Sequence, residues 1–292
     1  MGSAIEHEIR NRLPLAVVCS PSRVELDLSD GNVVKEYVRR FQPTHVFHTA
    51  ASVMGIAGHR DYPTKAEFEN LRIDLNVFEA LNECPPNWIF YASTVAAYGY
   101  PYRQIPLIEE DFLFGEPHGS ERGYALAKRR ALDLLNSLEI NHKSAYSYGI
   151  LTNLYGSKDK DSHGHGHVIA GLLSRAKTAQ KLNSALLVWG SGQATRDFIS
   201  AEKAAEIIVK LIDKNTHKIN IASGVETTIQ SIAMKIAESS NLSKGIQFTS
   251  ENEGIIRRFS DVSKLKSVIG DFETESLDLF LSEMSSRGHQ PP

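Results

Sequence analysis

The sequence predicts an α/β protein with a doubly wound parallel sheet of the Rossmann type and a smaller C-terminal α/β lobe. Short β-branched or aromatic runs alternate with amphipathic stretches along most of the chain, which is the pattern of parallel strands joined by crossover helices. The 292 residues suffice to bury a full core without disulfides, and only two are cysteines. After residue 224 the pattern changes to shorter helices around one strand, which indicates the second lobe.

The expected elements follow from these runs. Strands are expected over residues 15–19, 45–50, 88–94, 145–153, 186–189 and 219–222. Helices are expected over residues 3–12, 31–41, 64–83, 121–138, 167–182 and 201–213, and in the second lobe over 227–240, 261–268 and 277–284, with a strand over 246–249. Residues 1–160 with 185–223 are expected to form a coenzyme-binding domain, and residues 161–184 with 224–292 a substrate-binding lobe. Because no linker rich in Pro, Gly or Ser separates the two, we expect a large interface with a cleft.

The N-terminal segment departs from the usual dinucleotide-binding pattern, in which a buried strand leads through a Gly-rich turn into a helix. Here Met1-Gly2-Ser3 leads directly into a helical pattern, and the run at 15–19 is followed by Ser20-Pro21-Ser22-Arg23 without a glycine. That run is therefore interpreted as the second strand, with the first strand missing and Gly2 as the last glycine of the fingerprint. An acidic residue after the second strand favours NAD, whereas Arg23 suits a 2′-phosphate. The predicted coenzyme is NADP(H).

Composition excludes several classes of function. The net charge of −3 and the scattered arginine pairs give no basic surface for nucleic acid. No apolar run approaches the ~18 residues of a membrane span, so we expect a cytoplasmic protein. The run from His163 to His167 alternates histidine with glycine but has no acid or cysteine nearby in sequence, and no metal site is expected.

A tyrosine and a lysine stand four residues apart in Tyr124-Ala125-Leu126-Ala127-Lys128. This spacing puts both on one helix face, one turn apart. Lys128 is then expected to lower the pKa of Tyr124, so that the phenol exchanges a proton with a substrate oxygen. The alternative is an ordinary exposed pair of side chains.

Hydroxyls end the preceding strand, at Ser93-Thr94 before Tyr98-Gly99. The carboxyl ends of strands are where open α/β sheets bind ligands, so one hydroxyl is expected to complete a site with Tyr124 and Lys128. The alternative is a pair that only caps the strand.

Together these segments resemble the extended short-chain dehydrogenase/reductase family, whose pattern is a strand ending in [Ser/Thr]-x-x-x-Tyr-Gly, followed by Tyr-x-x-x-Lys. The spacing to Tyr98 assigns the hydroxyl position to Thr94. Further stretches are similar to the GDP-L-fucose synthase branch of the family: Met1-Gly2-Ser3-Ala4-Ile5, Met54-Gly55-Ile56, Asn70-Leu71-Arg72-Ile73, Thr152-Asn153-Leu154-Tyr155-Gly156, His167-Val168-Ile169, Val188-Trp189-Gly190-Ser191-Gly192 and Arg196-Asp197-Phe198.

The resemblance implies a role for each matching residue. Thr94, Tyr124 and Lys128 would act on the keto group, with His167 as the acid of an epimerisation. The residues implied at the coenzyme are Gly2, Arg23, Asp27, Leu28, Ala50, Ala51, Lys128 and Asn153. Those implied at the substrate are Ser93, Asn153, His167, Trp189, Arg196 and Arg258. An arginine is suited to a diphosphate because its planar guanidinium grips phosphate oxygens in pairs.

The expected function is NADP-dependent reduction of a GDP-linked 4-keto-6-deoxyhexose. Ala96 stands where the family carries a cysteine for epimerisation, and a methyl group accepts no proton, so epimerisation stays open. Two alternatives remain: a non-catalytic relative with weak or no coenzyme binding, or another sugar-nucleotide epimerase or dehydratase. The resemblance also implies a homodimer joined through the helices at 64–83 and 121–138.

Overall fold

Four parallel strands form the central sheet of the computed structural model, which describes residues 1–53, 62–156, 168–249, 254–274 and 276–287. Their order across the sheet is β1-β2-β3-β8. The strands are β1 (His45–His48), β2 (Trp88–Thr94), β3 (Ala145–Leu151) and β8 (His217–Ile221). All three pairings are parallel, as predicted for crossover connections.

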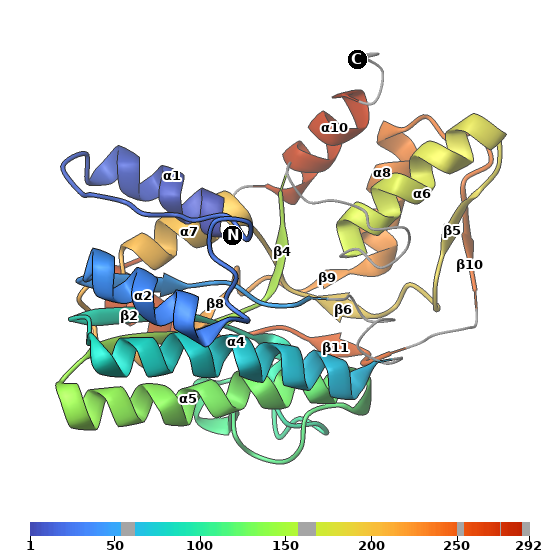
Figure 1. Ribbon diagram of the computed structural model, residues 1–292. Helices are drawn as coiled ribbons and strands as arrows, with labels where there is room; N and C mark the ends of the chain where they lie inside the picture. The colour runs from blue at the N-terminus through green and yellow to red at the C-terminus, as the bar shows by residue number, and fades with distance from the viewer. Residues whose placement is uncertain (54–61, 157–167, 250–253, 275, 288–292) are drawn as a thin grey trace.

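Helices cover both faces of this sheet (Figure 1). One face carries α2 (Gly31–Phe41), α4 (Pro63–Glu83) and α5 (Arg122–His142), and the other carries α1 (Gly2–Arg12), α7 (Ala201–Val209) and α9 (Ser263–Ile269). Strand β2 joins the two cores, because Ile89 and Tyr91 pack on the first face while Trp88 and Phe90 pack on the second. The predicted doubly wound arrangement is confirmed.

Local sequence signals explain where several helices begin. The Asp30 side chain accepts hydrogen bonds from the amides of Asn32 and Val33 and caps α2. Ser200 and Thr228 cap α7 and α8 (Ile229–Ser239) in the same way, and Pro63 opens α4. Three short 3-10 turns, η1 (Val95–Ala97), η2 (Glu109–Asp111) and η3 (Gly119–Glu121), lie between β2 and α5.

A third core lies among the later elements. Helix α8 packs there with α6 (Val168–Leu182) and α10 (Leu277–Arg287) beside the parallel pair β5 (Leu186–Val188) and β10 (Ile246–Phe248). Between this core and the main sheet lie two small ladders (Figure 1). One is the parallel pair β4 (Asn153–Tyr155) and β7 (Phe198–Ser200); the other joins β6 (Thr195–Arg196) to β11 (Arg257–Arg258) and β9 (Thr227–Thr228). The exact domain boundaries stay a prediction.

The strand expected over 15–19 is wrong. This segment is irregular, and Leu15 is 96% exposed. A strand needs a neighbour with which to share backbone hydrogen bonds, and β1 pairs with β2 alone among the described strands. The run expected over 145–153 also divides at Thr152 into β3 and β4, and 186–188 lies outside the main sheet. No helix in the described part of the chain is long and apolar enough to cross a membrane.

Candidate active site

The carboxyl end of β2 carries the two candidate hydroxyls, and the structure separates their roles. Ser93 is buried and its hydroxyl donates to the Tyr148 hydroxyl at 2.7 Å, so it lies in the core rather than on the site surface. Thr94 is partly exposed, and its oxygen accepts a hydrogen bond from the Ala96 amide at 3.2 Å. Thr94 therefore caps η1 and lies at the edge of the sheet where ligands bind.

Tyr124 and Lys128 lie in the first turns of α5, which packs directly against β2 and η1. Arg129 reinforces this contact by donating to the Ala97 carbonyl at 2.6 Å. Lys128 is only 1% exposed, and its Nζ lies 5.9 Å from the Tyr124 ring centroid. Lys128 is therefore buried and Tyr124 is partly buried, so the two do not form an exposed surface pair. That the Thr94 hydroxyl converges with Tyr124 on one carbonyl stays a prediction.

The pKa of Tyr124 differs from the expectation. Burial around its hydroxyl raises the pKa above the usual tyrosine value, and the negative charges of Asp74 and Glu121 raise it further. The expected lowering of the Tyr124 pKa by Lys128 is not found, and burial lowers the pKa of Lys128 itself. A raised pKa keeps the phenol protonated, which suits a proton donor rather than a base.

Gly123 sets the position of Tyr124 because it allows α5 to approach α4 closely. A Cβ atom built at Gly123 would lie 2.1 Å from the Pro63 carbonyl oxygen, which belongs to the first turn of α4. A backbone atom has little room to move away from such a contact. The first turn of α5 therefore depends on glycine at this position.

We expect Gly123→Ala to shift the first turn of α5 and to reduce any Tyr124-dependent activity about 10- to 100-fold, because small displacements of reacting groups are costly. The overpacking is expected to cost about 1–3 kcal/mol of unfolding free energy. Steady-state kinetics and urea denaturation measure the two effects. Gly119→Ala is the matched control, since a Cβ there meets nothing within 4 Å. Equal activity of the two variants would contradict the inferred role of Gly123.

A cluster behind the pair was missed by the sequence analysis. Asp74 on α4 is 2% exposed; its carboxylate is 2.8 Å from His48 Nε2 and accepts from the Tyr91 hydroxyl at 2.7 Å. The Tyr91 ring lies 4.5 Å from the Lys128 Nζ and stacks on Tyr148. One signal was available, because Asn70 and Asp74 stand one turn apart and share the buried face of α4.

Two arginines meet on neighbouring strands at the expected substrate side. Arg196 in β6 and Arg258 in β11 are partners in the parallel register. Arg258 is 5% exposed and its Nη1 donates to Glu121 at 2.8 Å, while Arg196 donates to the Thr195 carbonyl at 2.7 Å. Burial, and then the neighbouring Arg258, lower the pKa of Arg196 to about 10. A buried and a partly buried cation on adjacent strands, with the Glu121 carboxylate bonded to Arg258, suit a further anion.

The remaining substrate candidates lie on separate elements. Trp189 follows β5 and is about half exposed, with the Arg175 guanidinium 4.5 Å from its ring centroid. Asn153 opens β4, and its side-chain amide donates to the Asp197 carbonyl at 2.9 Å. His167, with the rest of the run from His163, lies outside the described residues.

Part of the expected coenzyme side comes together at the end of β1. Ala50 and Ala51 follow this strand, and Gly2 at the start of α1 lies against its end, since a Cβ there would be 3.2 Å from Thr49 Oγ1. The structure therefore brings Gly2 next to Thr49, the residue that precedes the two alanines.

The other coenzyme candidates are not held in the same place. Arg23 lies in an exposed turn rather than at a strand end. The exposed Asp27 is engaged by the amide and hydroxyl of Ser29, which lower its pKa. Leu28 contributes its carbonyl, which accepts from the Asn76 side chain at 2.8 Å.

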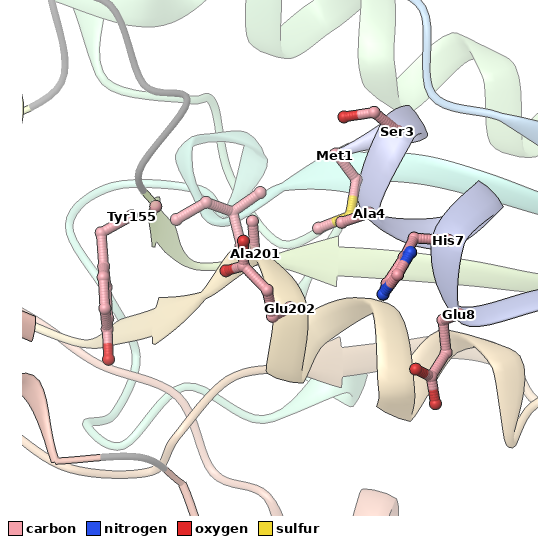
Figure 2. Close-up of a pocket in the computed structure, with 10 residues that line it drawn as sticks. Met1, Ser3, Ala4, His7, Glu8, Tyr155, Ala201 and Glu202 are labelled. Atoms are coloured by element: carbon pink, nitrogen blue, oxygen red, sulfur yellow. The ribbon is translucent and has the colours of Figure 1, made fainter. Parts of the chain in front are cut away.

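A cavity of about 300 Å³ opens beside the N-terminus of α1. Figure 2 shows its lining from three elements: the first turns of α1, the end of β4 and the start of α7. The residues are Met1, Ser3, Ala4, His7, Glu8, Leu154, Tyr155, Gly156, Ala201 and Glu202. The volume is at the lower end for small-molecule sites, which run from about 300 to 1,000 Å³.

Comparison with known proteins fits this arrangement. Residues 3–222 match the model of the NAD dependent epimerase/dehydratase family. The chain belongs to this family. The expected resemblance to extended short-chain dehydrogenases/reductases is thereby confirmed. The matched residues run from α1 to the end of β8 in this protein.

Named relatives of this epimerase/dehydratase chain include GDP-L-fucose synthase of Escherichia coli (strain K12), 28% identical over 295 residues that cover 97% of this chain and 91% of that protein. GDP-L-colitose synthase of Yersinia pseudotuberculosis is 29% identical over 226 residues, covering 75% and 72% of the two chains.

Solved structures confirm the Rossmann-type fold. A GDP-L-fucose synthetase from Naegleria fowleri bound to NADP has a TM-score of 0.87 at 22% identity, covering 98% of this chain and 89% of that one. The GDP-mannoheptose C4 reductase MlghC from Campylobacter jejuni, with NADP bound, has a TM-score of 0.82 at 23% identity, covering 99% and 94%.

Proposed function

We propose that the protein is an NADP(H)-dependent reductase of a nucleotide-linked 4-keto-6-deoxyhexose, with GDP as the nucleotide. The observation that carries the proposal is the pair of buried Lys128 and partly buried Tyr124 on α5, which packs beside the strand end that bears Thr94. The relatives named as GDP-sugar synthases support the substrate class, and the neighbours with NADP bound support the coenzyme.

The proposed chemistry is a balanced ketone reduction. NADPH, when bound, would supply the hydride that C4 of the sugar accepts. Tyr124 donates its phenolic proton to the C4 oxygen as the carbon–oxygen double bond becomes a single bond, and its raised pKa ensures that it carries that proton. Thr94 hydrogen-bonds the same oxygen, and the Lys128 ammonium stabilises the negative charge that develops on it and on the phenol.

Arg196 and Arg258 are proposed to hold the diphosphate, because they are register partners on β6 and β11 and both feel the charge of Glu121, which Arg258 binds. Trp189 is proposed to contact the nucleotide. Ala96 is buried within η1 and offers no acid or base, which supports reduction without ring epimerisation through that position.

The experiment is to mix the protein with NADPH and GDP-4-keto-6-deoxymannose and to follow the loss of NADPH absorbance, with GDP-mannose as the control that has no ketone. Protein-dependent NADPH oxidation with the ketone only supports the proposal. Absence of oxidation at saturating concentrations of both compounds overturns it.

A second candidate is a non-catalytic fold relative with weak coenzyme binding. The observation that favours it is the exposed turn of Arg23, which is not held at the end of a strand. Calorimetric titration with NADP(H) separates the two: no heat at millimolar coenzyme favours the second candidate, and saturable binding favours the reductase.

A further inference from the structure

The buried carboxylate of Asp74 has a fixed position behind the proposed catalytic pair. Its two oxygens are engaged separately: Oδ1 with His48 Nε2 at 2.8 Å, and Oδ2 with the Tyr91 hydroxyl at 2.7 Å. His48 comes from β1, Tyr91 from β2 and Asp74 from α4, so three elements hold one carboxylate in place. The reaction described above does not use any of the three.

Lys128 needs a buried partner of opposite charge. Its ammonium lies 4.5 Å from the ring centroid of Tyr91, whose hydroxyl is bonded to Asp74. Transfer of an ammonium from water into a protein interior is strongly unfavourable, and a cation–π contact recovers only a small part of that cost. Asp74 lies at the hydroxyl end of the same ring, and its negative charge favours the ammonium form of Lys128.

We propose that Asp74 is a positioning residue whose carboxylate, fixed by His48 and Tyr91, is the buried counter-charge that holds the Lys128 ammonium. This inference rests on the proposed reductase function, in which Lys128 acts as a cation. Through Asp74, helix α4 would then help to keep Lys128 on α5 in its charged form.

The charges around the pair agree with this assignment. Burial lowers the pKa of Lys128, and the charge of Asp74 raises it again. Asp74 also raises the pKa of Tyr124, as does Glu121, which precedes α5. The other titratable groups that face the pair are the hydroxyls of Tyr91 on β2 and Tyr148 on β3, and burial keeps the pKa of each well above its usual value.

Replacing Asp74 with a neutral residue is expected to lower the pKa of Lys128. The charge that favours the ammonium is then absent, so Lys128 loses its proton at a lower pH. We expect a fall of about one unit or more, which is typical of a single nearby charge. The alkaline limb of the pH–rate profile should move to lower pH by the same amount.

The test compares Asp74→Asn with Tyr91→Phe. The first removes the charge and keeps groups able to hydrogen-bond to both neighbours; the second removes a hydrogen bond and keeps the charge. The side-chain nitrogen of Lys128 is followed by NMR in protein labelled with nitrogen-15 lysine, and its resonance is assigned by its loss in Lys128→Met. The pH profile of NADPH oxidation is measured in parallel.

A lower Lys128 midpoint in Asp74→Asn, with the midpoint in Tyr91→Phe within about half a unit of the parent, supports the proposal. An unchanged midpoint in folded Asp74→Asn overturns it, as does an equal shift in both variants. If Asp74→Asn does not fold, the Lys128 midpoint is measured in Asp74→Thr, a second neutral variant, and the same two outcomes apply. Because the NMR midpoint needs no substrate, a failure of the proposed reductase activity is distinguishable from a failure of this inference.

Discussion

Replacing Lys128 with methionine is expected to lower the rate of NADPH-dependent ketone reduction about 100-fold or more, the scale of a lost proton-transfer partner. Methionine has a similar length and no charge, so it removes the ammonium and fills most of the same buried space. The 1% exposure of Lys128 means that no solvent cation can readily replace the lost charge.

The measurement is kcat/KM for NADPH and the keto sugar, with the unfolding transition as a check on the fold. Lys181→Met is the matched control, because Lys181 is an exposed residue in the last turn of α6 and is expected to leave both quantities unchanged. Wild-type turnover by folded Lys128→Met would refute the proposed role of the ammonium.

Replacing Asp197 with alanine is expected to reduce the unfolding free energy by about 3 kcal/mol or more, because several partly buried donors lose their acceptor at once. Asp197 is 0% exposed. Its Oδ1 accepts from the Ser223 amide at 3.0 Å and hydroxyl at 2.7 Å, and its Oδ2 accepts from the Gly224 amide at 2.9 Å. These bonds join the segment between β6 and β7 to the turn that follows β8.

Urea denaturation measures this loss. Asp271→Ala is the comparison, since the Asp271 side chain is 96% exposed and its ion pair with Lys266 is expected to contribute less than about 1 kcal/mol. Equal stability of the two variants would show that the Asp197 contacts do not hold the two segments together.

The sequence predicted the main sheet well where an element carries its own signals. The strand expected at 88–94 and the helix expected at 31–41 match β2 and α2 residue for residue. In β2 the first six positions are all buried, as expected for a strand covered on both faces, and in α2 the Asp30 cap and the apolar spacing agree. The helix that carries Tyr124 and Lys128 was likewise expected, and the two residues were singled out by their spacing together with the Ser93-Thr94 strand end and the family resemblance.

The errors arose where the outcome depends on distant partners. Residues 15–19 have strand propensity, yet Leu15 is exposed because no described strand pairs with the segment. Spacing placed Lys128 near Tyr124 but gave no measure of burial, which reverses the expected direction of the tyrosine pKa. Asp74 was missed because its partners also come from distant elements. Periodicity along α4 does not show that this acid binds His48 and Tyr91 behind α5.

The central claim is that Tyr124 delivers the proton in an NADPH-dependent ketone reduction. The most direct measurement compares the parent with Tyr124→Phe for NADPH oxidation in the presence of GDP-4-keto-6-deoxymannose, with coenzyme affinity measured by calorimetry in both. The account predicts that the parent oxidises NADPH, and that the variant binds it equally well and reacts about 100-fold or more slowly. Equal rates for the two proteins would contradict it.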